Sequence, residues 1–263
     1  MPQKLKPSLL FLGTGSSTGI PVIGCKCAVC LSSSKYNRRM RPSAWIKHGK
    51  STYLIDVGPD FRNQALLFHL PKMDALFLTH THFDHIAGID ELRSYAFDDP
   101  SKISCILSKE SYEDLKVRYD YLMMPSDKGI LNSQLDFKIL ENESGSSNVA
   151  GIDFKYVSFS QKGMNVTGYI FGNLAYICDI KDYSDEILTD LKGIEILIIS
   201  AARETSSRMH LSLAEAIDFS RKVHAKKTYF THISHDMDHE TISKRLAPDQ
   251  QLAYDGLEIE FNL

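Results

Sequence analysis

Short apolar runs that end abruptly in polar or glycine-rich segments recur along this chain. Leu9–Leu12 precedes a glycine- and hydroxyl-rich loop at residues 13–19, and Ala75–Leu78 precedes a segment rich in histidine. Similar runs are Ala175–Cys178 and Lys227–Phe230. Apolar runs of this length, bounded by turn-forming residues, are typical of buried strands. We therefore predict strands whose ends carry the polar groups of the molecule.

Helical patterns lie between these strands. Lys109–Tyr121 predicts an amphipathic helix. Ser212 followed by Glu215 predicts a capping box that opens a helix ending near Val223. Residues 141–148 are polar and predict a loop.

The segment 79–85 reads Thr-His-Thr-His-Phe-Asp-His and carries the densest chemistry of the chain. If the preceding strand continues to His82, then His80 and His82 point to one face, because side chains alternate along a strand. After a turn, Asp84 and His85 would approach the same point. Imidazole and carboxylate groups at this spacing suit Zn, Mn or Fe, and chance clustering of polar loop residues is the weaker explanation.

Three cysteines, Cys25, Cys27 and Cys30, lie too close together to pair with one another. In a reducing compartment they predict a zinc site that needs one more ligand from elsewhere in the chain. Free thiols are the alternative. Cys105 and Cys178 lie in apolar runs and are predicted to be buried core thiols.

Other polar groups leave two interpretations open. Asp179 ends an apolar strand, where it could bind a metal or cap the next segment. Asp56 or Asp60 could orient a ligand histidine or cap a helix. His210 precedes a predicted helix, where active-site groups often lie. The loop 13–19 and the basic segment 37–42 could each contact an anion, although a flexible turn and a solvated loop explain them as well.

The composition and charge of the chain narrow the classes of function that it can have. The chain has 263 residues, of which 43% are hydrophobic and 24% charged, as in ordinary soluble proteins. Its net charge of −3 gives no general electrostatic reason to bind nucleic acid or an anionic membrane. No run is long enough to span a bilayer or to form the core of a signal peptide. We expect a cytoplasmic protein with one domain over residues 1–263.

The pattern H-x-H-x-D-H resembles the metallo-β-lactamase superfamily. Together with G-C-x-C-x-x-C, D-x-G-P-D and Thr231-His232-Ile233-Ser234-His235, it is most similar to the branch that includes phosphoribosyl cyclic phosphodiesterase (PhnP). The resemblance implies an α/β fold, the four-layer αββα sandwich, with metals at one edge of the two sheets.

The resemblance also implies roles for single residues. It implies three metal sites: one for a first catalytic ion, one for a second catalytic ion and one for a structural zinc. The ligands would be His80, His82 and Asp179 for the first ion, Asp84, His85, Asp179 and His232 for the second, and Cys25, Cys27, Cys30 and His235 for the zinc. Asp179 would bridge the two catalytic ions, which are Zn or Mn. His210 occupies the position of the general acid, and Asp84 belongs to the catalytic group.

One position departs from the family pattern. The family has a third histidine on the first metal shortly before the strand at Gly168, and residues 158–167 contain none. Gln161 lies closest to the expected position. An amide oxygen is a poorer ligand than imidazole for such metals. We therefore expect the first ion to be held weakly or to have a water in the gap.

These features together predict a metal-dependent phosphodiesterase. Its substrate would be a small, cyclic phosphodiester, attacked by a hydroxide held between two ions, and His210 would protonate the leaving group. The expected partner is a small molecule and neither nucleic acid nor a membrane, and the sequence leaves a homodimer open. Alternatives are a non-hydrolytic metal-binding protein resembling PqqB, a nuclease like tRNase Z, and a thioesterase of the same superfamily.

Overall fold

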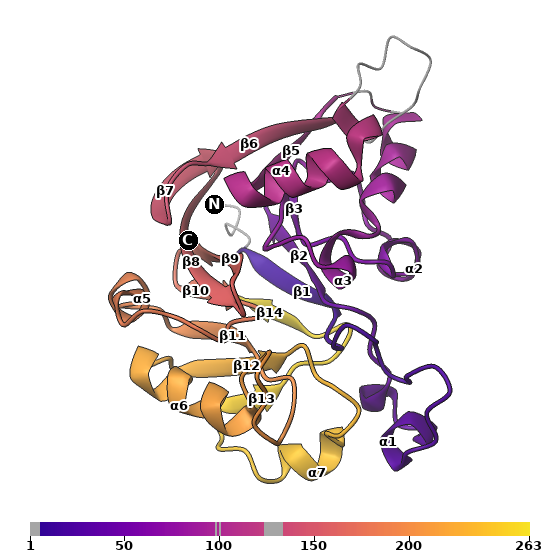
Figure 1. Ribbon diagram of the computed structural model, residues 1–263, viewed down its shortest axis with the longest axis vertical. Coiled ribbons are helices and arrows are strands. Elements are labelled where there is room, and N and C mark those ends of the chain that lie inside the picture. Colours follow the sequence, from indigo (N-terminus) through magenta and orange to yellow (C-terminus); the bar gives the residue numbers. More distant parts are fainter. Residues whose placement is uncertain (1–5, 98, 100, 124–133) are drawn as a thin grey trace, which may run out of the picture.

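Two stacked β-sheets with helices on both outer faces form the molecule (Figure 1). The computed structural model describes residues 6–97, 99, 101–123 and 134–263. The four-layer αββα arrangement expected from the resemblance is therefore confirmed. In the described part of the chain, no helix is both long and apolar enough to cross a membrane.

The first sheet has the strand order β14-β1-β2-β3-β4-β5-β6. Its strands are β1 (Ser8–Gly13), β2 (Ser43–His48), β3 (Ser51–Ile55), β4 (Ala75–Phe77), β5 (Ile103–Ser108), β6 (Leu135–Leu140) and β14 (Glu258–Glu260). The second sheet has the order β13-β12-β11-β10-β9-β8-β7. Its strands are β7 (Ser144–Val149), β8 (Ile152–Gln161), β9 (Met164–Phe171), β10 (Leu174–Ile177), β11 (Ile196–Ser200), β12 (Lys227–Thr231) and β13 (Gln250–Leu252).

Helices cover the outer face of each sheet. The first sheet carries α2 (Phe61–Phe68), α3 (Phe83–Ile86) and α4 (Lys109–Arg118), and the second carries α5 (Glu186–Asp190), α6 (Leu213–Val223) and α7 (His239–Ser243). The remaining helices are α1 (Ala28–Leu31) and the 3-10 helices Lys35–Asn37, Ile89–Phe97 and Asp120–Met123. The capping box at Ser212 and Glu215 is confirmed at the start of α6.

Alternation along the strands divides the apolar residues among three core layers. In β1, Leu9 and Phe11 belong to the core between the sheets, whereas Leu10 and Leu12 pack under the helices of the first sheet. In β11, Ile198 faces the other sheet. Because a strand exposes successive side chains on opposite faces, a continuous apolar run fits a strand that is buried on both sides.

Two expectations about local structure are wrong. The strand β4 ends at Phe77 and does not continue to His82. Residues 144–149 form β7, not a loop, and pair antiparallel with β8. This edge strand is exposed for most of its length, so backbone pairing holds it and no apolar pattern marks it.

We predict that Phe77→Ala lowers the free energy of unfolding by about 3–5 kcal/mol. Phe77 is fully buried, and its ring meets Phe154, Tyr169 and Phe171 edge-on at centroid distances of 5.1 Å. Urea denaturation would measure the change. The control Phe97→Ala alters an exposed ring and should stay within about 0.5 kcal/mol of the unchanged protein. Equal losses in both variants would contradict this account of the core.

Candidate metal centre

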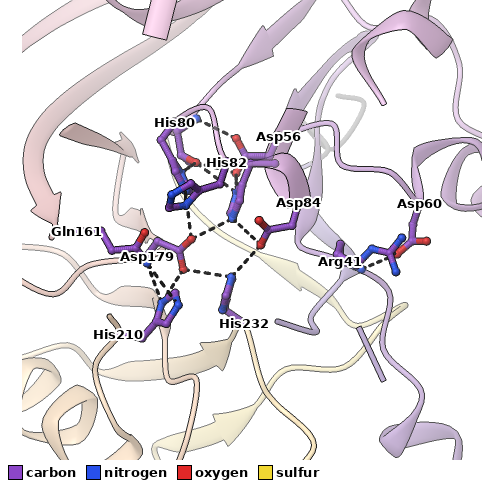
Figure 2. A network of polar contacts seen from close by, with 12 residues as sticks. Arg41, Asp56, Asp60, His80, His82, Asp84, Gln161, Asp179, His210 and His232 are labelled. Carbon is purple, nitrogen blue, oxygen red and sulfur yellow. Dashed lines mark hydrogen bonds and ion pairs between the residues drawn. The ribbon is translucent and has the colours of Figure 1, made fainter. Parts of the chain in front are cut away.

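A cluster of buried polar side chains lies at one edge of the two sheets, where several strands end (Figure 2). The first sheet supplies residues after β3 and β4 and from α3, and the second supplies residues after β10 and β12. The cluster residues are Asp56, His80, His82, Asp84, His85, Asp179, His210 and His232. The structure thus brings together groups from positions 56 to 232 of the sequence.

Asp179 lies at the centre of this cluster. Its Oδ2 atom is 3.3 Å from His80 Nε2 and 3.0 Å from His85 Nε2. Its Oδ1 atom is 3.2 Å from both His232 Nε2 and His210 Nδ1. The carboxylate therefore faces two histidines through each of its two oxygens.

The other ligand candidates complete two groups around Asp179. His80 Nε2 lies 2.8 Å from His82 Nδ1, so these two side chains meet although the strand before them is short. Asp84 Oδ2 lies 3.2 Å from His232 Nε2 and 3.4 Å from His85 Nε2. The two groups are His80, His82 and Asp179, and Asp84, His85, Asp179 and His232.

Three residues of the site have left-handed backbone conformations. Asp56, Asp179 and His232 have φ angles of 57°, 59° and 58°. Asp56 and His232 directly follow the last residues of β3 and β12, and Asp179 is the second residue after β10. Residues other than glycine rarely adopt this conformation, and it is typical of places where a site over-determines the backbone. Here the left-handed conformation turns the backbone out of the strand at each of the three positions and leaves the side chain in the cluster.

Asp56 orients His85. Its Oδ2 atom lies 2.7 Å from His85 Nδ1, and the N–H and hydroxyl of Thr79 donate to its two oxygens at 2.8 and 2.9 Å. A carboxylate on the far nitrogen leaves the other nitrogen of a ligand histidine directed at the metal. Of the two aspartates that the sequence left open, Asp56 has this contact, whereas Asp60 pairs with Arg41.

Charge and burial set the protonation of the cluster. Burial favours the neutral form of His80 and His82 and lowers the pKa of both, that of His82 to about 4. Burial alone would also lower the pKa of His85 and raise that of Asp179. The neighbouring carboxylates outweigh it for His85, and the charge of His232 outweighs it for Asp179, so the pKa of His85 is raised and that of Asp179 is lowered.

The donor set fits divalent metal ions. Asp179 Oδ1 and His85 Nε2, which both face the cluster, are buried without a hydrogen-bond partner of good geometry among the described residues. Uncharged His80 and His82 offer nitrogen lone pairs, and Asp84 and Asp179 supply negative charge. Buried carboxylates and imidazoles without protein partners are stabilised by a cation between them.

Gln161 has only its amide oxygen available as a substitute ligand. Its Nε2 atom lies 2.9 Å from His210 Nδ1, and its Oε1 atom is buried without a partner. Figure 2 shows the amide beside Asp179 and His210. The side chain is 2% exposed, so it fills the space next to the His80–His82–Asp179 group. From histidine and carboxylate side chains, that group has three candidate ligands among the described residues, one fewer than the group around His232.

A second cluster joins the N-terminal segment to the C-terminal one. The Sγ atoms of Cys25, Cys27 and Cys30 lie 3.3, 3.5 and 3.6 Å from His235 Nδ1. The backbone N–H of Cys30 lowers the pKa of the Cys27 thiol to about 6, which favours the thiolate form that binds metals. Three sulfurs and one imidazole around a point suit a closed tetrahedral zinc site.

Two functional contacts were missing from the sequence reasoning. Thr79 Oγ1 bridges Asp56 and His80, which lies 3.0 Å away. The backbone and guanidinium of Arg41 pair with Asp60 beside Asp84 (Figure 2). The pattern T-H-T-H and the basic segment contain these residues, but a hydroxyl next to a histidine is too common to single out.

Comparison with known proteins identifies relatives of this chain. The family model of the β-lactamase superfamily domain matches residues 51–233. A solved structure of a new diphosphatase from the PhnP family superposes with a TM-score of 0.90 at 35% identity, covering 98% of each chain.

Curated relatives carry different names. An octanoyltransferase of Porphyromonas gingivalis is 30% identical over 253 residues, which are 95% of this chain and 50% of that protein. The chain thus spans about half the length of this relative. A ribonuclease Z of Listeria welshimeri is 23% identical over 97% of both chains.

We predict that Cys30→Ser removes one tightly held zinc ion per chain, because a closed site that loses one of four ligands binds zinc far more weakly. Elemental analysis after mild chelation would measure zinc content. The control Cys105→Ser changes a buried cysteine outside both clusters and should retain the ion. Equal zinc content in all three proteins would refute the Cys/His235 assignment.

We also predict that Gln161→His increases metal affinity at the His80–His82–Asp179 group by about tenfold or more, because an imidazole replaces an amide beside it. Calorimetric titration of the chelated protein with Zn²⁺ and Mn²⁺ would report the change. Gln161→Leu is the control, since it removes the amide without adding a ligand and should bring no gain. A gain in Gln161→Leu would show that the effect does not come from the new imidazole.

Proposed function

This chain belongs to the PhnP-like branch of the metallo-β-lactamase superfamily, and we propose that it hydrolyses small phosphodiesters, including cyclic ones, with the help of divalent metal ions. The observation that carries the proposal is the central position of Asp179, which faces both candidate ligand groups. A carboxylate shared between two ligand groups is suited to a pair of ions, which act on phosphoryl transfer in many hydrolases.

In this proposal His80, His82 and Asp179 hold the first ion, and Asp84, His85, Asp179 and His232 hold the second. Zinc and manganese both suit these ligands. When bound, the ions would lower the pKa of water and neutralise charge on the phosphoryl oxygens. Asp56 and Thr79 keep His85 and His80 in position, because their contacts reach the ring nitrogens on the far side.

His210 is the proposed general acid. Its side chain is 18% exposed, whereas Asp179 and the ligand histidine His232 are almost fully buried. Asp179 and Gln161 make their closest contacts to Nδ1, so Nε2 is the nitrogen better placed to give a proton to the leaving oxygen. A half-buried imidazole at the edge of a buried charge cluster is well suited to proton transfer with a substrate that enters from solvent.

The relatives support this choice to different extents. The PhnP-family diphosphatase favours phosphate chemistry, and its similarity extends over nearly the whole of both chains. The octanoyltransferase is twice as long, so acyl transfer is a weaker basis for a proposal. The ribonuclease Z makes RNA the natural comparison substrate in the test.

We predict that His210→Ala lowers kcat by about 10²- to 10⁴-fold for a phosphodiester with a poor, alkoxide leaving group. For bis(4-nitrophenyl) phosphate, whose leaving group needs no proton, the loss should be below about tenfold. Steady-state kinetics with adenosine 2′,3′-cyclic phosphate and bis(4-nitrophenyl) phosphate would measure both losses.

The control His224→Ala changes an exposed histidine at the end of α6 and should leave both rates unchanged. Similar losses of His210→Ala on both substrates would argue against the acid role. If neither phosphodiester is hydrolysed by the metal-loaded protein but single-stranded RNA is, the small-molecule proposal is wrong.

A further inference from the structure

The ligand pair His80 and His82 lies on a loop that begins where β4 ends, after Phe77. Backbone hydrogen bonds fix the start of this loop against the second sheet. The N–H of Thr167, in β9, donates to the carbonyl oxygen of Thr79 at 2.8 Å. This contact stops one residue before the ligand pair, so the pair itself needs another support.

Arg118 supplies that support. Its Nη2 atom donates to the carbonyl oxygen of Thr81 at 2.6 Å. Thr81 stands between the two histidines and is 4% exposed, so its carbonyl needs a partner within the protein. Among the described residues, this is the only hydrogen bond that reaches the backbone of residues 80–82 from another part of the chain. Arg118 therefore orients the peptide group that leads into His82.

The ring of His82 has less support of its own than the other histidines of the first sheet. Asp56 lies 2.7 Å from His85 Nδ1, and Thr79 Oγ1 lies 3.0 Å from His80 Nδ1. In His82, Nδ1 faces His80 Nε2 at 2.8 Å, and Nε2 has no hydrogen-bond partner among the described residues. His82 is also only partly buried. Its direction therefore depends on the backbone that leads into it.

The helix α4 presents the guanidinium at a defined place. Its first turn is capped by Ser108, which accepts from Ser111 N, and Leu115 is fully buried in the core under the helices of the first sheet. Arg118 is the last residue of α4 and forms an ion pair with Asp114, one helical turn earlier. A planar guanidinium held by a carboxylate and a carbonyl has few orientations left. The contact to Thr81 is thus anchored in the core through α4.

The small number of ligands in this group makes the support of His82 important. Among the described histidine and carboxylate side chains, the group consists of His80, His82 and Asp179 alone. A group with three such ligands has no spare one to compensate for a histidine that turns away. Groups that orient metal ligands from behind typically contribute 10- to 100-fold to metal affinity.

We propose that Arg118 is a positioning residue for the first metal ion, because it holds the Thr81 carbonyl and thereby directs His82 Nδ1 towards that ion. The proposal rests on the proposed function, in which His80, His82 and Asp179 hold the ion. Arg118 contacts neither the ion nor the substrate in this role. It acts on the affinity of one metal site, and the second ion group and the Cys/His235 cluster do not depend on it.

The test removes the guanidinium and keeps the apolar stem. Chelated protein would be titrated calorimetrically with Zn²⁺, and the binding step that His82→Ala removes identifies the first group. We expect Arg118→Met to weaken this step by about 10- to 100-fold. Arg118→Lys keeps a cationic donor and should recover part of the affinity. Lys116→Met is the matched control, since it removes an exposed cation from the same helix and should change nothing.

A general loss of structure is separated from this effect by the other metal sites. The affinity of the second ion group and the zinc content of the Cys/His235 cluster should stay unchanged in Arg118→Met. Equal weakening at all sites, or an unchanged affinity of the first group, would overturn the proposal. Asp114→Asn removes the ion pair that holds the guanidinium and should weaken the first group by a smaller factor, so the test stays informative if Arg118→Met does not fold.

Kinetics give a second readout. With bis(4-nitrophenyl) phosphate, Arg118→Met should need about 10- to 100-fold more Mn²⁺ for its half-maximal rate, while kcat at saturating Mn²⁺ stays within about twofold of the unchanged protein. A lowered kcat with an unchanged Mn²⁺ requirement would contradict a role through the metal site. If the unchanged protein binds metal but hydrolyses no phosphodiester, the proposed function fails, and the titrations still decide the role of Arg118.

Discussion

The burial of one carboxylate, that of Asp179, is the constraint on which the site depends. Asp179 is 1% exposed and ends an apolar strand in a left-handed conformation. An unpaired buried carboxylate would cost several kcal/mol, so it persists only where charged or hydrogen-bonding groups surround it. Four histidines from both sheets supply that surrounding, at 3.0 to 3.3 Å from its two oxygens. The charge balance and the pairing of the two sheets are therefore coupled at this residue.

The sheets provide the rigidity that this arrangement needs. β10, β11 and β12 are parallel neighbours, so Asp179 and His232 leave the same edge of the second sheet. Across the interface, Tyr169 donates its hydroxyl to the Leu78 carbonyl at 2.7 Å, next to the T-H-T-H segment. A fully buried tyrosine with a satisfied hydroxyl fixes the distance between the sheets more firmly than apolar packing alone. The histidines of the first sheet therefore meet the carboxylate of the second at a defined separation.

Much of the fold and of the candidate site could be predicted from the sequence. The features that could not be predicted were missed for physical reasons. The histidine motif, Asp179 and His232 stood out because each follows an apolar run, and the resemblance supplied their ligand roles and the layer order. The choice between Asp56 and Asp60 was not decided, because both lie in the short segment between the same strand and the next helix. Their difference lies in a contact to His85 that is 29 positions away. The strand β7 was missed because an exposed edge strand leaves no apolar pattern.

The Cys/His235 cluster and the ligand candidate His232 share one stretch of chain. The pairing of Gly15 with Ile233 lays the glycine-rich loop along the segment that carries both His232 and His235. The three cysteines then hold the end of that loop against His235, and the basic segment returns along Ile20 through its pairing with Arg39. A change in the cysteine cluster would therefore be transmitted to the segment that carries His232 by a few backbone hydrogen bonds. In this view the Cys/His235 cluster acts as a positioning element for the segment that carries His232.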